Sequence, residues 1–265
     1  MTEPANVEQF WRQPPWAGAK PKYRLGLSPI PLENWFTQPI TSAVLKHKQQ
    51  MLNQQYSSVV AASEEHGGLG AQRELSPFLT AADEFTDPIA NMALSVDDDL
   101  CIIQATGEQR LVAGCVCSPS YWNLQSKIGK PLRHIHGPVI SMNEKIGDPI
   151  ERFINRAPLL QPFERINWFI HGDSRRWHPV EEPLPQTPVA TWHIRSERET
   201  LCRYSDEHLL FTINTRFQPL AAIVDYPQAQ ADLRTTLMNL DTDEVDYFGG
   251  PNKCEMLIGY LESLL

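Results

Sequence analysis

Apolar and polar residues alternate along several segments in the middle and C-terminal parts of the chain, a pattern typical of β-strands. Two short apolar runs flank Thr106-Gly107-Glu108 and predict a hairpin. In the last segment, Leu209, Phe211 and Ile213 share one side, so that side faces a core. The predicted strands cover residues 100–104, 111–117, 165–171, 192–204 and 209–217.

Helical spacing of apolar residues appears before, between and after these strands. Thr41 is a suitable cap for a helix that continues toward Val60. Asp148-Pro149-Ile150-Glu151 combines an acidic cap, a first-turn proline and a capping glutamate, which predicts a helix start. Gly67-Gly68-Leu69-Gly70 is interpreted as a flexible loop, because no strand precedes it and no phosphate-loop lysine follows it. Two amphipathic helices are predicted near residues 228–240 and 252–264.

The order of these elements predicts an α+β fold. Two strands, a helical middle and three strands suggest an antiparallel sheet with helices covering one face. Prolines cluster at residues 14–39 and 179–188, which we expect to be loops or extended arms. We therefore expect a single domain overall, with an extended proline-rich arm at 1–40, a main body at 41–250 and a C-terminal helix at 251–265.

Composition and charge narrow the functional classes. The 42% hydrophobic and 21% charged residues are ordinary for a globular protein, and no run approaches the roughly 18 apolar residues of a membrane span. The net charge of −9 opposes attraction to nucleic acid. The start of the chain lacks the basic residues and apolar core of a secretory signal, so we expect a cytoplasmic location. Five cysteines without a Cys-x-x-Cys pair argue against a disulfide framework, a zinc ribbon and covalently attached haem.

A series of short motifs runs along most of the chain, from about residue 25 to residue 250. Together they resemble the haem-dependent oxidative N-demethylase α-subunit family. The central motifs lead from Pro119-Ser120-Tyr121-Trp122 to Ile135-His136-Gly137-Pro138-Val139. The further matches are residues 32–35 (LENW), 111–118 (LVAGCVCS), 127–129 (KIG), 165–168 (RINW), 195–201 (RSERETL) and 210–213 (LFTI).

The resemblance implies a PAS-like domain at 41–250 that holds haem b. It also implies a monooxygenase that uses O₂ to remove a methyl group from a small secondary amine such as dimethylamine, with release of formaldehyde. In that family, electrons come from NADPH through partner subunits that carry FMN and a 2Fe-2S cluster. This chain has neither a dinucleotide fingerprint nor a four-cysteine cluster, so we expect a partner reductase.

His136 is the expected iron ligand. A neutral imidazole is a common haem ligand, and a following Gly-Pro turn lets the ring project from the backbone. Read alone, such a histidine is more typical of a hydrogen-bonded loop residue, and the resemblance is what makes it the expected ligand. His134, two residues earlier, is the competing candidate.

Glu197 is the expected catalytic carboxylate. On a strand it shares a face with Arg195 and Glu199, while Arg198 points the other way. A carboxylate there would orient a cationic amine, and the alternative is a strand face with ordinary Glu–Arg pairs. The further candidate haem contacts, with the arginines as partners of its propionates, are Arg165, Asn167, Trp168, Arg195, Arg198 and Arg203; the alternative for Trp168 is a core position.

Departures from the family pattern flank the expected pocket. Asp97-Asp98-Asp99, Ile140 and Tyr204-Ser205-Asp206 stand where the family has other residues. They bear on the substrate more than on the fold. Two alternatives to the enzyme therefore remain: a haem-binding PAS-type sensor of gas or redox state, and an interaction module without a cofactor.

Overall fold

The computed structural model describes residues 4–22, 24–80, 83–137 and 143–264. Its centre is a seven-stranded sheet in which every neighbouring pair is antiparallel. The α+β class expected from the sequence is confirmed. In spatial order the strands are β1 (Ser28–Pro29), β5 (Phe163–His171), β6 (His193–Arg203), β7 (His208–Pro219), β3 (Asp99–Gln104), β4 (Leu111–Cys115) and β2 (Val60–Ala62).

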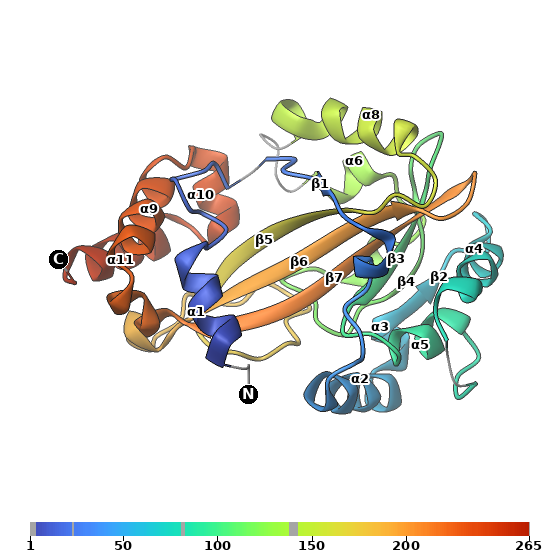
Figure 1. Ribbon diagram of the computed structural model, residues 1–265, viewed down its shortest axis with the longest axis horizontal. Coiled ribbons are helices and arrows are strands. Elements are labelled where there is room, and N and C mark those ends of the chain that lie inside the picture. The colour runs from blue at the N-terminus through green and yellow to red at the C-terminus, as the bar shows by residue number, and fades with distance from the viewer. Residues whose placement is uncertain (1–3, 23, 81–82, 138–142, 265) are drawn as a thin grey trace.

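The long strands β5, β6 and β7 form the middle of the molecule (Figure 1). Glu197 of β6 is paired with Asn167 of β5 on one flank and with Thr215 of β7 on the other. The side chains of these three residues therefore lie on the same face of the sheet. We call this side of the sheet the carboxylate face, after Glu197 and Glu199, and the other side the helix face. The predicted hairpin is also confirmed, with a bulge between Ile102 and Ile103.

Most helices pack on the helix face in two groups, which lie at different ends of the sheet (Figure 1). One group covers β3 and β4, where Leu100 and Ile102 are fully buried. It consists of α2 (Ser42–Gln54), α3 (Tyr56–Val59), α4 (Gly68–Leu75) and α5 (Pro88–Ala93).

The other group covers β5 and β6, where Trp168 and Ile194 are buried. The helices at 228–240 and 252–264 are confirmed as α9 and α11, whereas α1 and α10 were not predicted. The sequence signal for α10 was present, because Asp241 and Glu244 form a capping box at its start. The group consists of α1 (Pro4–Arg12), α9 (Pro227–Met238), α10 (Thr242–Phe248) and α11 (Pro251–Glu262).

Two helices, α6 (Leu132–Ile135) and α8 (Asp148–Arg156), pack on the carboxylate face instead. Leu132 and Ile154 bury their side chains there against Leu201. The helix start at Asp148 is confirmed, but the N-cap position is Gly147, and the Asp148 carboxylate pairs with Arg133 of α6. This pair ties the two helices together.

The glycine-rich segment is a correction to the sequence prediction. Gly67 has a left-handed φ of 70° and caps α4, which begins at Gly68, so the segment is a helix start and not a flexible loop. Within the described residues, no helix is long and apolar enough to cross a membrane. The short helical turns are η1 (Leu32–Asn34), η2 (Ser76–Phe78), η3 (Leu124–Ser126), η4 (Asn143–Gly147), η5 (Val189–Thr191) and η6 (Leu220–Asp225).

Candidate functional site

Glu197 lies in the middle of the carboxylate face with a partner on each oxygen. Arg195 Nε donates to Oε1 across 2.9 Å, and Asn167 Nδ2 donates to Oε2 across 3.4 Å. The Glu197 residue is 6% exposed. A carboxylate that is buried and held from both sides has a fixed orientation, which a site for a cationic group requires.

Glu199 lies two residues further along β6 and is the second buried carboxyl group of this face. Arg165 on β5 lies directly opposite, and its Nε is 2.8 Å from Glu199 Oε2. Burial nevertheless raises the pKa of Glu199 to about 7, with the negative charge of Glu197 acting in the same direction. Glu199 is therefore able to gain or lose a proton near neutral pH.

Lys22, in the segment that leads from α1 to β1, reaches the same cluster from outside the sheet. Its Nζ is 2.6 Å from the Trp168 carbonyl oxygen and 3.4 Å from Asn167 Oδ1. The Nζ also lies 4.0 Å from the centroid of the Phe169 ring, a cation–π distance. Burial lowers the pKa of Lys22 to about 7. The Lys22 amino group, which is partly protonated near neutral pH, thus occupies one side of the carboxylate cluster.

Arg195 links Glu197 to the segments at the end of the sheet. Its side chain is fully buried and donates to the Ser118 carbonyl oxygen, to Thr215 Oγ1 at 3.1 Å and to the Arg176 carbonyl oxygen at 3.2 Å. With its bond to Glu197, the guanidinium therefore has four partners within the protein. Arg195 is a structural support of Glu197 in this arrangement.

The segment that contains Ser120 and Tyr121, part of the central motif, packs on the same end of the sheet. Tyr121 has a left-handed φ of 59°, and its ring stacks on His171 with centroids 4.7 Å apart. Ser120 Oγ lies 3.2 Å from His171 Nε2. Burial, followed by the charge of Arg195, lowers the pKa of His171 to about 2, so its imidazole is neutral. Here the motif contributes packing around Arg195.

His136 lies at the C-terminal end of α6, on the carboxylate face. The residue is half-buried, whereas His134 is exposed. Burial and then the charge of Arg165 lower the pKa of His136 to about 4. The ring makes no hydrogen bond with any residue that the structure describes. Pro138, Val139 and Ile140 lie outside the described residues.

The remaining predicted contacts do not gather around His136. Trp168 is on the helix face, where it packs edge-on against Trp16 with ring centroids 5.0 Å apart. Arg198, as expected, points away from Glu197 and pairs with Glu164 at 2.6 Å. Arg203 bonds the backbone carbonyls of Asn155, Ser205 and Asp206. Of the four arginines, only Arg165 exerts its charge on His136.

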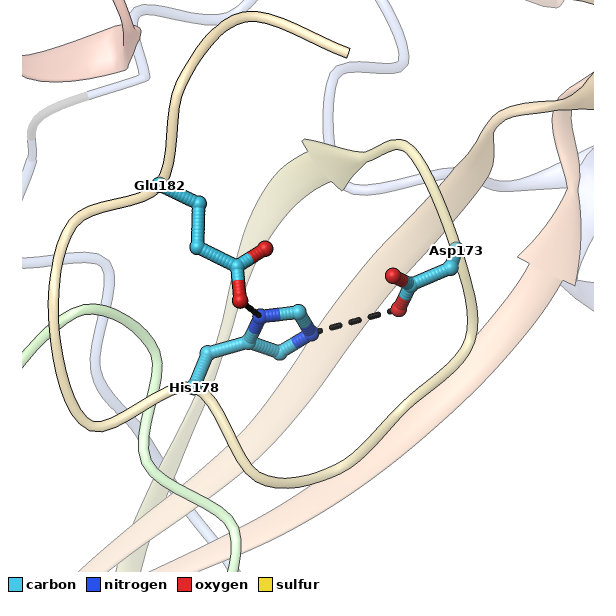
Figure 2. Close-up of side chains that lie close together, drawn as sticks. All are labelled: Asp173, His178 and Glu182. Carbon is cyan, nitrogen blue, oxygen red and sulfur yellow. Dashed lines mark ion pairs between the residues drawn. The ribbon is translucent and has the colours of Figure 1, made fainter. Parts of the chain in front are cut away.

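The loop after β5 carries a separate cluster of one histidine and two carboxylates. The His178 ring lies between two carboxylates, with Nε2 3.3 Å from Asp173 and Nδ1 3.2 Å from Glu182 (Figure 2). These are donor types that bind metal ions. However, Arg175 pairs with Asp173 at 2.8 Å and with Glu182 at 3.0 Å, so both carboxylates already have a cationic partner within the chain. The cluster holds the two ends of the loop segment 173–182 together, and we call it the loop clamp.

Lys22 and Tyr247 are the residues of the cluster that sequence reasoning missed. The carboxylates of Glu197 and Glu199, after burial, help to raise the pKa of Tyr247 to about 12, so its hydroxyl group is near them. Lys22 lies in a proline-rich segment and Tyr247 on an unpredicted helix. Neither has a local pattern that points to the sheet, and only the tertiary fold brings them there.

Comparison with known families decides which family the chain belongs to. The family described as "Haem-dependent oxidative N-demethylase, alpha subunit-like" matches residues 36–255, which is most of the sequence. The chain belongs to this family. No curated protein matches the sequence.

The N-demethylase α-subunit-like match includes His136, Arg165, Asn167 and Glu197, whereas Lys22 precedes it.

The chemistry of the residues around His136 is compatible with a bound haem. A half-buried imidazole without a hydrogen bond to a described residue stands on the carboxylate face, next to the apolar cluster that contains Phe211. A haem site combines such a ligand with an apolar lining.

Proposed function

We propose that this chain is the haem-carrying subunit of an oxidative N-demethylase, a monooxygenase that acts on a small secondary amine and releases formaldehyde. The observation that carries the proposal is the family match, combined with a buried, doubly held carboxylate on the same sheet face as His136. Haem b, when bound, would supply the O₂ activation that the side chains of this chain cannot perform.

His136 is the proposed ligand of the iron. Its ring is not engaged by other described residues, and its low pKa keeps it in the neutral form that ligation needs. His134 is exposed and is the weaker candidate. Arg165, whose charge acts on His136, is the proposed partner for a haem propionate because a guanidinium binds a carboxylate in a forked geometry. Arg165 also pairs with Glu199, but it is the one of the four arginines whose charge acts on His136. Arg195, Arg198, Arg203 and Trp168 are therefore not carried into the proposed site.

Glu197 is the proposed anchor of the amine. A secondary amine is cationic near neutral pH, and a fixed buried carboxylate would orient it and hold its proton. Asn167 contributes by holding one Glu197 oxygen, so its role is to position the carboxylate. The proposal includes a PAS-like domain and a cytoplasmic location. It also includes an NADPH-dependent partner reductase with FMN and a 2Fe-2S cluster.

The test is haem reconstitution of the purified protein, followed by absorption spectroscopy. We expect a Soret band in the wild type, an altered or absent band in His136→Ala, and an unchanged band in the matched control His134→Ala. Dimethylamine should then shift the wild-type spectrum, and formaldehyde should form when a reductase is supplied. Absence of a Soret band would refute the haem proposal. A haem spectrum without an amine response or formaldehyde would favour a PAS-type sensor instead.

A further inference from the structure

We infer that the N-terminal segment around Lys22 is a component of the carboxylate site, in which Lys22 is a positioning residue for Glu197 and Glu199. The inference deepens the proposed function and rests on it only for the catalytic meaning of Glu197. Lys22 lies before the part of the chain that the family model matches, so the family description does not include it.

The first contact route runs from Lys22 through Asn167 to Glu197. Lys22 Nζ lies 3.4 Å from Asn167 Oδ1, and the same amide donates through Nδ2 to Glu197 Oε2 at 3.4 Å. A cation on the amide oxygen fixes which end of the Asn167 side chain faces the carboxylate. The shorter bond from Nζ to the Trp168 carbonyl oxygen, at 2.6 Å, anchors the ammonium at the edge of β5.

The second route runs from the same segment to Glu199. Arg165 NH1 donates to the Arg24 carbonyl oxygen at 3.2 Å, while Arg165 Nε pairs with Glu199 at 2.8 Å. One guanidinium is therefore held between the segment and the carboxylate. Lys22 thus supports Glu197 through Asn167, and Arg24 supports Glu199 through Arg165. These two separate connections would not be needed if the segment only covered the sheet.

The charges around the pair explain why Lys22 matters electrostatically. Glu197 and Glu199 face cationic groups from three sides and a hydroxyl group from a fourth. Both carboxylates favour the charged form of Lys22, and Lys22 in turn favours the charged form of Glu199. The facing groups are Lys22 from the segment, Arg165 and Asn167 from β5, Arg195 from β6 and Tyr247 from α10, with Lys253 of α11 acting on Lys22.

The consequence is a site whose charge depends on the N-terminal segment. Without Lys22, two carboxylates on one buried face would repel each other with one cation fewer nearby, and Glu199 would retain its proton to higher pH. With Lys22 in place, Glu199 ionises more readily. Lys22 therefore adds, beside the larger effect of Arg165, to the negative charge available to a cationic amine at the neighbouring Glu197.

The experiment is a ¹³C NMR titration of glutamate side-chain carboxyl groups in the full-length protein, with the Glu199 signal assigned by Glu199→Gln. It needs neither haem nor amine, so its failure is distinguishable from an absent Soret band. We expect Lys22→Met to raise the Glu199 midpoint, by less than loss of the Arg165 charge would, because Arg165 has the larger effect on that pKa. Lys22→Arg should restore the midpoint because the charge is kept. The matched control Lys20→Met, at an exposed position in the same segment, should leave it unchanged.

A reciprocal measurement keeps the inference testable if Lys22→Met does not fold. Coupling between two titrating groups must be equal in both directions. The Lys22 side-chain signal should therefore titrate at lower pH in Glu199→Gln than in the wild type. An unchanged Glu199 midpoint in folded Lys22→Met, or an unchanged Lys22 midpoint in Glu199→Gln, would overturn the inference, as would an equal effect of Lys20→Met.

Discussion

Arg195 and Glu197 lie two residues apart on β6 and form a 2.9 Å ion pair between two almost fully buried side chains. A pair of this kind is costly to break from one side, because the remaining charge stays buried without a partner. Since the same guanidinium also donates to the Ser118 carbonyl oxygen, the pair joins the end of the 111–118 motif to the carboxylate site.

Removal of Arg195 should therefore destabilise the protein strongly. We expect Arg195→Met to lower the free energy of unfolding by about 3–5 kcal/mol, measured by urea denaturation. Replacement of both partners, with Glu197→Leu added, should recover part of the loss because Glu197 is then not left as a buried charge without its partner. The control is Arg12→Met, since Arg12 pairs with Glu8 at the surface and its loss should not be measurable. Equal effects of the two arginine changes would contradict this account.

The start of α4 gives a prediction about two neighbouring glycines. A Cβ atom at Gly68 would clash with the Val112 carbonyl oxygen and lie 2.9 Å from Ser63 N, both backbone atoms, whereas a Cβ at Gly70 would meet nothing within 4 Å. Gly68→Ala should therefore cost about 1–3 kcal/mol of unfolding free energy. Gly70→Ala should instead stabilise the helix by about 0.5–1 kcal/mol, because alanine is the better helix former. Thermal unfolding of the two variants checks the opposite signs.

These glycines also show where sequence reasoning ends. The strands β3 to β7 were predictable from their apolar runs and from the alternation of apolar and polar residues, and Leu209 to Phe217 forms a strand as expected. The two short edge strands β1 and β2 were not predicted. Gly68 was misread because its reason for being glycine is a close approach to β4, which lies more than 40 residues away in the sequence. The sequence pattern contains no trace of such a contact.

The site was predictable to a similar degree. Strand parity placed Arg195, Glu197 and Glu199 on one face and Arg198 on the other, as the register shows. Parity could not show that the guanidinium of Arg195 is already hydrogen-bonded to other groups of the protein. The arrival of Lys22 from a segment far away in sequence was equally hidden.

The loop clamp should respond to loss of its buried member. His178 is 1% exposed and stands between Asp173 and Glu182, so His178→Ala would leave two carboxylates facing a cavity. We expect thermolysin to cleave the segment 173–182 faster in this variant, with fragments identified by mass spectrometry. The matched control is Glu181→Ala, at an exposed position of the same loop, which should be cleaved at the wild-type rate. Cleavage at the wild-type rate in His178→Ala would refute the clamp.

The pKa of Glu199 makes stability depend on pH in a defined window. Its ordinary value of 4.5 in the unfolded chain rises to about 7 in the folded protein, mainly through burial. Between these values folded Glu199 binds more protons than unfolded Glu199, so its contribution to stability falls as the pH rises. The contribution of the protonated carboxyl group is complete below pH 4.5 and is lost as the pH rises through about 7.

Glu199→Gln removes this titration. The difference in unfolding free energy between the variant and the wild type should therefore increase in favour of the variant from pH 4.5 to pH 7, and stay constant at higher pH. Urea denaturation at closely spaced pH values measures the difference, in which the other titrating groups cancel to first order. Glu255→Gln, at an exposed position of α11, is the matched control and should run parallel to the wild type. If Glu199→Gln also runs parallel, then Glu199 is already ionised throughout this range, and Arg165 outweighs its burial.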